Sequence, residues 1–232
     1  MFKEYIHKIR EYMKGNVFKI MQYVIGGLIM LLLVTFCVIL MTKGLQSINR
    51  ERLHSYYIYE DMNRLKYEET KYELVTAIDE YIASVAPNSC LNGIAILDNC
   101  LKYNMDVCFV LAQGQNESYF GTTGLARKTN SVFNVLAFDG KKFEEIDRKG
   151  KYKYPDESIE PYMILLQKEY LINGKTEYDM MDKYVNKHGK RYASSETYEV
   201  ALKNTFLKIK NNTRIDSLSQ ELHKYQLILG MY

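Results

Sequence analysis

A run of 23 residues from Ile20 to Thr42 contains no charged side chain. At about 1.5 Å of helical rise per residue, this run is long enough to cross roughly 30 Å of hydrocarbon. A cleaved signal peptide has a shorter apolar core, about 7–15 residues, followed by small residues at the cut site. This run is longer and ends in Met41-Thr42-Lys43. The sequence therefore predicts a transmembrane helix over residues 20–42 that anchors the chain in the lipid bilayer.

Positive charges flank the predicted span unevenly. The five that precede it are Lys3, Lys8, Arg10, Lys14 and Lys19. The three that follow closely are Lys43, Arg50 and Arg52. Because positive charge concentrates on the cytoplasmic side, we expect residues 1–19 to be a cytoplasmic basic N-terminus and the large domain to lie outside. Residues 1–19 form either a basic amphipathic helix on the inner leaflet or a solvated tail.

The overall composition excludes several classes of protein. The formal net charge is only +3 and no Lys/Arg-rich block is present, so nucleic acid is not an expected partner. Hydrophobic residues make up 47% and charged residues 25%, which is typical of a globular domain rather than of a multi-pass membrane protein. Tyrosine occurs 21 times and tryptophan not at all, so any sugar-binding surface must use tyrosine or phenylalanine.

The rest of the chain divides into a spacer, a domain and a tail. Residues 43–86 are rich in charged residues and tyrosine, and apolar residues recur at helical spacing near their end, which predicts a helical stalk. The Pro87-Asn88-Ser89 cluster ends this stalk. We expect a domain over residues 87–210 and a C-terminal helical tail over residues 211–232. Sustained heptads are not visible in the stalk, so the oligomeric state is left open.

The cysteines do not predict a metal or redox centre. Cys37 lies in the predicted span, and Cys90, Cys100 and Cys108 form no C-x-x-C pair. No metal and no cofactor are therefore expected. Two interpretations stay open for the cysteines outside the span: a Cys90–Cys100 disulfide, or unpaired thiols buried in the core.

The segment from Val107 to Gly140 carries the candidate chemistry. As a helix, it places Val107, Val110 and Gly114 on one apolar stripe, and Glu117 continues that stripe. A carboxylate at the end of an apolar stripe is partly desolvated, which favours the protonated form that a general acid needs. Gly114, one turn earlier, is expected to leave space for a substrate. The alternative is a solvated glutamate near a helix end, since glutamate is mostly exposed.

Several motifs in this segment and beyond it occur in the order typical of a known family. LAQGQNES, YFG, GLA and TNSVFNVLAFDG are followed by KRYASSETYEVAL. Together they resemble glycoside hydrolase family 73, the bacterial glucosaminidases, over about residues 90–210. The matching residues are Ala112, Gln113, Glu117, Ser118, Gly121, Leu125, Ala126, Asn130, Phe133, Tyr154, Ser158, Tyr192, Ala193, Ser194 and Tyr198.

The chain departs from the family pattern at three places. Asn116 stands where the family has an apolar residue before the glutamate, and Asn134 replaces a glycine. Ser131-Val132 is inserted between Asn130 and Phe133. These changes are expected to reshape the substrate groove more than the fold.

The resemblance implies a mainly α, α+β lysozyme-like domain with a small β-lobe. Asp139-Gly140 lies between the strand-like runs 132–138 and 143–146, which predicts a β-hairpin at that lobe. Helices are expected near 157–172, 177–187 and 195–210.

The resemblance also implies a substrate and a set of roles. The substrate would be peptidoglycan glycan strands, cut at the β-1,4 bond between N-acetylglucosamine and N-acetylmuramic acid, although muramidase specificity stays open. Glu117 would be the general acid, and Tyr192 would position the acetamido group or a water. The second carboxylate would be Glu144 or Glu145, unless the substrate's own acetamido group assists. The expected substrate-binding residues are Gln113, Ser118, Asn130, Phe133 and Tyr198. The alternative function is a wall-binding or assembly module that uses the same groove without turnover.

Overall fold

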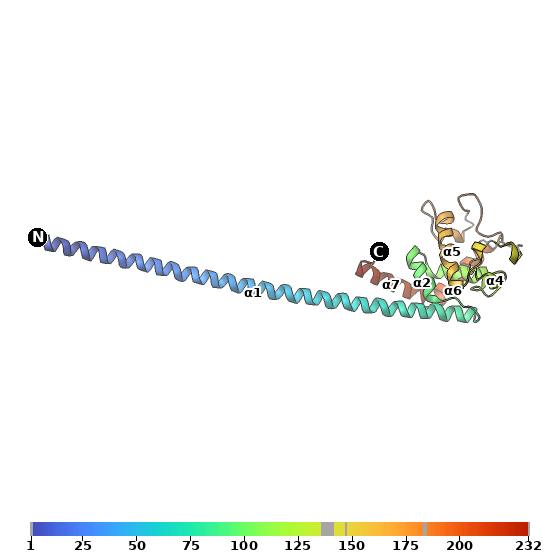
Figure 1. Ribbon diagram of the computed structural model, residues 1–232, viewed down its shortest axis with the longest axis horizontal. Helices are drawn as coiled ribbons and strands as arrows, with labels where there is room; N and C mark the ends of the chain where they lie inside the picture. Colours follow the sequence, from blue (N-terminus) through green and yellow to red (C-terminus); the bar gives the residue numbers. More distant parts are fainter. Residues whose placement is uncertain (1, 136–141, 147, 183–184, 232) are drawn as a thin grey trace. The chain divides into compact units, whose positions relative to one another are not determined.

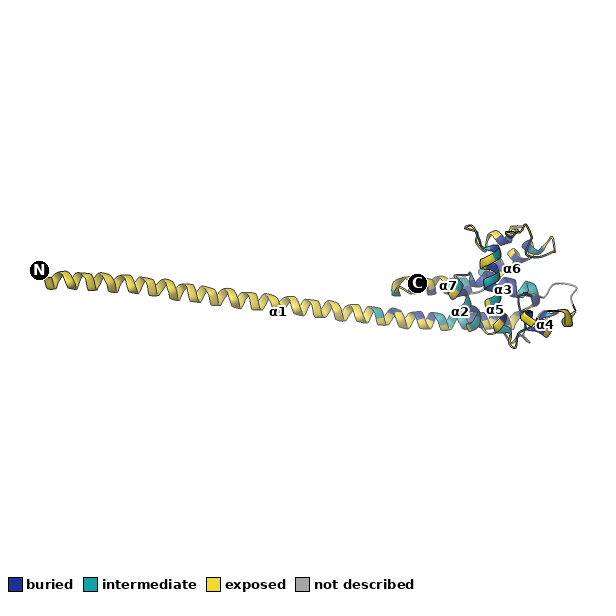
Figure 2. Cartoon of the chain, turned by 45° about the horizontal axis from the view of Figure 1, so that its top comes forward, coloured by how far each residue is buried: buried dark blue, intermediate teal, exposed yellow. Residues whose placement is uncertain are grey.

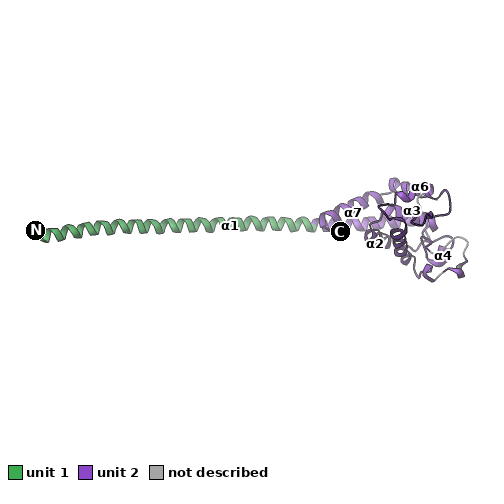
Figure 3. Ribbon diagram, turned by 90° about the horizontal axis from the view of Figure 1, so that it is seen from above, with its two compact units in different colours: residues 1–61 green, residues 62–232 purple. Residues whose placement is uncertain are grey.

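A computed structural model describes residues 2–135, 142–146, 148–182 and 185–231 of the chain. The chain forms two compact units, Met1–Asp61 and Met62–Tyr232, which Figure 3 distinguishes by colour. The first unit consists of the N-terminal part of the helix α1 (Phe2–Val85). The second unit contains the last part of α1 and all the other elements.

The apolar part of α1 lies in the first unit, and there the side chains are exposed (Figure 2). The helix is long enough and apolar enough to cross a membrane. The two threonines of its apolar part pair their hydroxyls within the helix, since Thr35 donates to the Leu32 carbonyl at 2.8 Å and Thr42 to that of Ile39 at 2.9 Å. A helix that pairs its polar groups internally suits a hydrocarbon environment, where water is absent.

Every named element of the second unit is a helix or a helical turn in the part that the structure describes (Figure 1). Its further α-helices are α2 (Gly93–Tyr103), α3 (Val107–Ser118), α4 (Ala126–Thr129), α5 (Ile159–Leu165), α6 (Tyr198–Asn212) and α7 (Ile215–Leu229). A π-helical turn, Leu166–Tyr170, continues α5. Short 3₁₀ turns span Phe143–Glu145, Arg148–Gly150, Pro155–Ser158 and Asp179–Met181. The prediction of a mainly helical domain is therefore confirmed.

Helix α3 is the centre of this unit. Its residues from Val107 to Gly114 are all buried, and helices α2, α6 and α7 all pack against it. A helix that is buried on every side belongs to a core rather than to a surface, so the single apolar stripe expected from the sequence was too narrow a description. Asp106 caps the helix by accepting hydrogen bonds from the Cys108 amide at 2.7 Å and the Phe109 amide at 3.2 Å.

The C-terminal part of α1 joins the same core. Its buried residues follow helical spacing: Asn63, Tyr67, Thr70, Leu74, Ala77, Ile78, Tyr81 and Ile82. Where α2 begins, the Gly93 amide donates to the Asp79 carboxylate at 2.6 Å. A Cβ at Gly93 would lie 2.9 Å from the Val75 carbonyl oxygen, so this close approach of α2 to α1 requires glycine.

Two predictions of secondary structure were wrong. The Asp139-Gly140 turn of the expected hairpin lies outside the described residues. Of the two expected strands, residues 132–135 of the first and 143–146 of the second are described. Residues 132–135 form turns, and Phe143–Glu145 is a 3₁₀ turn rather than a strand. A helix was also expected near 177–187. In the described residues of that range, the helical part is the 3₁₀ turn Asp179–Met181. The sole extended pairing among the described residues is an antiparallel bridge between Val185 and Arg191.

Of the two interpretations left open for the cysteines outside the span, the Cys90–Cys100 disulfide is not formed, and all four cysteines of the chain are free thiols. Cys90 is exposed, whereas Cys100 and Cys108 are buried in the core. Burial raises the pKa of both buried thiols, and the nearby Asp106 carboxylate raises them further. Their thiols therefore stay protonated and act as small apolar core groups.

Candidate active site

Glu117 lies in the last turn of α3, at the point where this buried helix reaches the surface. Gln113, one turn earlier, is completely buried, whereas Glu117 is half-buried. The Glu117 carboxylate therefore lies at the edge of the core, as the position of Glu117 after the apolar run predicts.

Two neutral donors hold the Glu117 side chain. The Tyr198 hydroxyl donates to Oε1 at 2.6 Å, and the Asn134 amide lies 3.3 Å from Oε2. The same Asn134 amide donates to the Glu117 backbone carbonyl at 2.8 Å. Because Tyr198 is the first residue of α6, the carboxylate connects the end of α3 to the beginning of α6.

Asn134 was not among the residues expected at the site, although its departure from the family's glycine was visible in the sequence. Its backbone is left-handed, with φ of 53°. Asparagine adopts this conformation more readily than other residues with side chains. It therefore keeps the turn that glycine would make and adds an amide that reaches the carboxylate. The signal that could have identified it was an asparagine at a position that favours glycine.

Gln113 extends the contact with Tyr198 into the core. Its amide nitrogen donates to the Tyr198 hydroxyl oxygen at 3.1 Å, and its amide oxygen accepts a hydrogen bond from the Tyr162 hydroxyl. Tyr162 is completely buried and stacks on Phe133, with ring centroids 3.8 Å apart and planes 8° apart. A chain of hydrogen bonds therefore runs from Tyr162 through Gln113 and Tyr198 to Glu117.

The other expected substrate-binding residues make contacts within the protein. The buried Ser118 hydroxyl donates to the Val132 carbonyl at 2.6 Å and accepts from the Gly121 amide at 2.7 Å. Asn130 donates to the carbonyls of Tyr152 and Lys153, both at 3.0 Å. These bonds fix the segment that follows α3.

Gly114 does not leave a space for substrate. A Cβ at this position would lie 3.1 Å from the ring of Phe120 and 3.4 Å from that of Phe133. The space that a side chain would take at Gly114 is therefore filled by two aromatic rings of the core. The expectation that Gly114 leaves room for a substrate was wrong.

Tyr192 lies beside Tyr198 rather than on Glu117. The two rings stack with centroids 5.7 Å apart, and Tyr170 meets Tyr192 edge-on at 5.2 Å. Burial, and then the nearby charge of Glu117, raises the pKa of both the Tyr192 and the Tyr198 hydroxyls. Both phenols therefore stay protonated. Tyr198 is also the phenol whose hydroxyl donates to Glu117.

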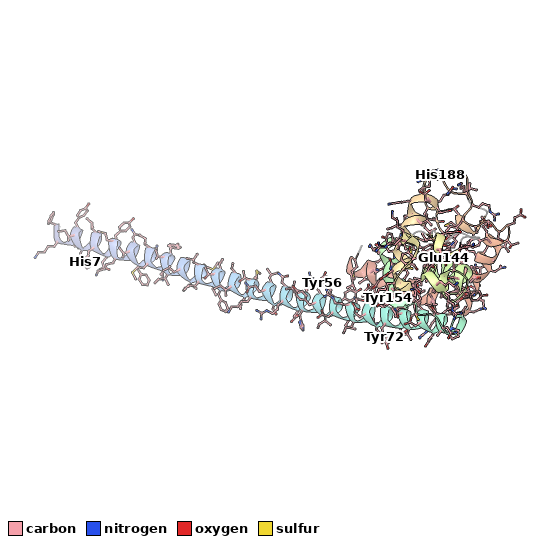
Figure 4. All side chains as sticks on the ribbon, turned by 45° about the vertical axis from the view of Figure 1, so that its right-hand side comes forward. His7, Tyr56, Tyr72, Glu144, Tyr154 and His188 are labelled. Carbon is pink, nitrogen blue, oxygen red and sulfur yellow. The ribbon has the colours of Figure 1, made fainter. Side chains whose placement is uncertain are left out.

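Glu144 and Glu145 are both exposed on their 3₁₀ turn, and Glu144 is labelled in Figure 4. The Glu145 carboxylate accepts a hydrogen bond from the backbone amide of Lys142 at 3.1 Å. In the part of the chain that is described, neither glutamate is hydrogen-bonded to Glu117 or its partners. The structure thus brings together Gln113, Glu117, Tyr192 and Tyr198.

Two further family positions play supporting roles. The Ser158 hydroxyl accepts from the Val132 amide at 3.1 Å and donates to the Pro155 carbonyl at 2.7 Å. Asn116 accepts a hydrogen bond at 3.0 Å from Thr205 on α6. No group of three or more His, Cys, Asp or Glu side chains that could hold a metal occurs among the described residues.

The fold and the site define a helical domain with a hydrogen-bonded carboxylate at the edge of its core. Residues 94–211, half of the chain, match the Glucosaminidase family, described as mannosyl-glycoprotein endo-beta-N-acetylglucosaminidase. The chain therefore belongs to this family, glycoside hydrolase family 73, and is a glycoside hydrolase whose expected substrate is peptidoglycan. A comparison with curated proteins found no match.

The turn that follows Glu117 is strained. Tyr119 ends α3 with φ of 46°, Phe120 follows with φ of 54°, and both are left-handed. This conformation costs an L-residue roughly 1–2 kcal/mol, and helices commonly place glycine there. The Tyr119 side chain is 50% exposed, so it loses little packing when removed.

We expect Tyr119→Gly to raise the free energy of unfolding by about 1 kcal/mol, because the left-handed backbone is then unstrained. Urea unfolding of the full chain in detergent would measure it. Ala201→Gly is the matched control, since it places glycine at an exposed right-handed position of α6 and should cost about 1 kcal/mol. An equal decrease in the free energy of unfolding in both variants would contradict the strain at Tyr119.

Proposed function

We propose that this protein is a membrane-anchored peptidoglycan hydrolase that cleaves the β-1,4 bond between N-acetylglucosamine and N-acetylmuramic acid, with Glu117 as general acid. The observation that carries the proposal is the hydrogen-bonded placement of Glu117 at the end of the buried helix α3. Membership of the glucosaminidase family supports the substrate class. Mass spectrometry of the reducing ends released from peptidoglycan distinguishes this specificity from that of a muramidase.

The two oxygens of Glu117 are held unequally. Tyr198 donates to Oε1 at 2.6 Å, while Asn134 is 3.3 Å from Oε2. Oε1 accepts the shorter hydrogen bond, the one from Tyr198, and an oxygen that accepts this proton is not the one that carries the acidic proton. We therefore assign proton delivery to Oε2. In the reaction, the Oε2 proton moves to the glycosidic oxygen as its bond to the anomeric carbon breaks.

The first prediction concerns Glu117. Glu117→Gln keeps the size of the side chain but cannot deliver a proton. General acid–base assistance is worth about 10²–10⁴-fold, so hydrolysis of purified cell walls should fall at least a hundredfold on that estimate. The melting temperature and the binding to walls should stay close to those of the wild type. A variant that digests walls at the wild-type rate would remove Glu117 from the mechanism.

The same assay separates the alternative function. A wall-binding or assembly module would bind purified walls while wild type and Glu117→Gln alike released no fragments. Membership of the glucosaminidase family supports the enzyme, and the Tyr198 and Asn134 hydrogen bonds hold Glu117 in one position, as a general acid requires.

The second prediction concerns the group that stabilises the positive charge at the anomeric carbon or activates water. Glu144 and Glu145 are the candidate carboxylates, and the acetamido group of the substrate is the alternative. We expect a Glu144→Gln/Glu145→Gln double variant to fold normally, since both side chains are exposed. If either carboxylate stabilises the charge or activates the water, the turnover of the double variant should fall at least tenfold, on the lower part of the range for acid–base groups. Full turnover would assign that role to the acetamido group.

The third prediction concerns topology. The apolar part of α1 and the greater number of positive charges before it support a cytoplasmic N-terminus and an extracytoplasmic domain. Protease added to spheroplasts should therefore digest the domain while a fragment containing residues 1–42 stays protected. Protection of the domain until the membrane is opened would contradict this topology and its access to the wall.

A further inference from the structure

The segment that carries Tyr192 and Tyr198 has no regular structure to hold it. Between these two residues the chain forms bends and turns, and α6 begins at Tyr198. The preceding residue, Thr197, makes no side-chain hydrogen bond to the first turn of α6. Gln113 and Tyr170 contact the two side chains, so what is still needed is an interaction that holds the backbone of this segment.

An ion pair closes this segment at both ends. Arg191 directly precedes Tyr192, and Glu199 directly follows Tyr198. The Arg191 Nε donates to Glu199 Oε1 at 2.9 Å, and its terminal nitrogen donates to Oε2. That same nitrogen also donates to the Ser195 carbonyl at 3.0 Å, which ties the middle of the segment to its ends. Two parallel bonds of this kind fix direction as well as distance.

The Glu199 end of the pair is shielded from water, and the pair is anchored on both sides. Glu199 is only 3% exposed, and the Arg191 guanidinium compensates its charge. Arg191 is also held by its antiparallel bridge to Val185. On the other side, α6 packs against α3, where Thr205 donates to Asn116 at 3.0 Å.

We propose that the Arg191–Glu199 ion pair is the positioning device that places the Tyr198 hydroxyl on Glu117 and stacks Tyr192 beside it. This inference rests on the proposed function for its catalytic consequence. Arg191 and Glu199 are positioning residues, since neither touches the carboxylate that reacts. The planar fork of arginine is essential to this role, and lysine retains the charge without the two parallel bonds.

A double-mutant cycle tests the proposal with the full chain in detergent. Arg191→Lys and Tyr198→Phe should each lower the turnover of purified cell walls about tenfold to a hundredfold, the scale of a misplaced catalytic group. The double variant should be no slower than the slower single variant, because both changes remove the same contact. Losses that multiply would overturn the proposal. Glu199→Gln replaces Arg191→Lys in the cycle if the latter does not fold.

Lys203→Gln is the matched control. It breaks an exposed ion pair to Asp182, 3.4 Å long, on the same helix α6. Lys203→Gln should change turnover only slightly. Tyr198→Phe should lower turnover by the same factor in the Lys203→Gln variant as in the wild type. Coupling of the same size at Lys203 would also overturn the proposal, because it would show a general response of α6.

The same cycle, measured by urea unfolding, needs no activity. Tyr198→Phe should shift the unfolding midpoint of the wild type and leave that of Arg191→Lys almost unchanged. Equal shifts in both backgrounds would overturn the proposal. A wild-type chain that does not hydrolyse walls would contradict the proposed function alone, and the unfolding cycle would still decide the role of the ion pair.

Discussion

The hydrogen bond from Tyr198 to Glu117 joins the end of α3 to the beginning of α6. It lies at the outer end of a chain of polar contacts that begins at the buried Tyr162 and passes through Gln113. A buried amide is costly unless its groups are paired, so Gln113 requires both tyrosine hydroxyls in place. The position of Glu117 is therefore set from inside the core, and the arrangement of α3 and α6 follows from the same requirement.

The aromatic residues around this chain explain how α3 can end so abruptly. Phe120 folds back over Gly114, and its ring meets that of Tyr81 edge-on at 6.2 Å. This packing forces the left-handed backbone at Tyr119 and Phe120, because a continued helix would carry Phe120 away from Gly114. Burial of a phenylalanine side chain is worth roughly 1.5–3 kcal/mol, which is comparable with the roughly 2–4 kcal/mol of strain at the two left-handed residues.

Sequence patterns predicted those features that depend on local periodicity or on an ordered set of motifs. The apolar run of α1, the helix that ends at Glu117 and the family are of this kind. The contact between Tyr198 and Glu117 spans 81 positions, and no local pattern encodes it. Gln113 and Phe133 matched the family and were assigned to substrate, but matching letters do not distinguish a side chain that builds a site from one that contacts its ligand.

The hairpin and one helix were mispredicted for a related reason. Asp-Gly favours a tight turn wherever it occurs, but the flanking residues must also find partners across the turn. Phe143–Glu145 adopts a 3₁₀ turn instead, stabilised locally by the bond from Lys142 to Glu145. Near 177–187, the Thr176 amide and hydroxyl both bind the Asp179 carboxylate, a local turn that competes with a helix.

The buried phenols have a consequence for the behaviour of the protein in alkali. Burial raises the pKa of Tyr162, Tyr192 and Tyr198 above the ordinary tyrosine value of about 10. Above that pH the unfolded chain releases these protons and the native one retains them, so the native state loses stability as the pH rises further. Because the chain has no tryptophan, its near-ultraviolet absorption comes chiefly from tyrosine, and the same spectrum reports both the ionisation of these phenols and the unfolding of the cluster around Glu117.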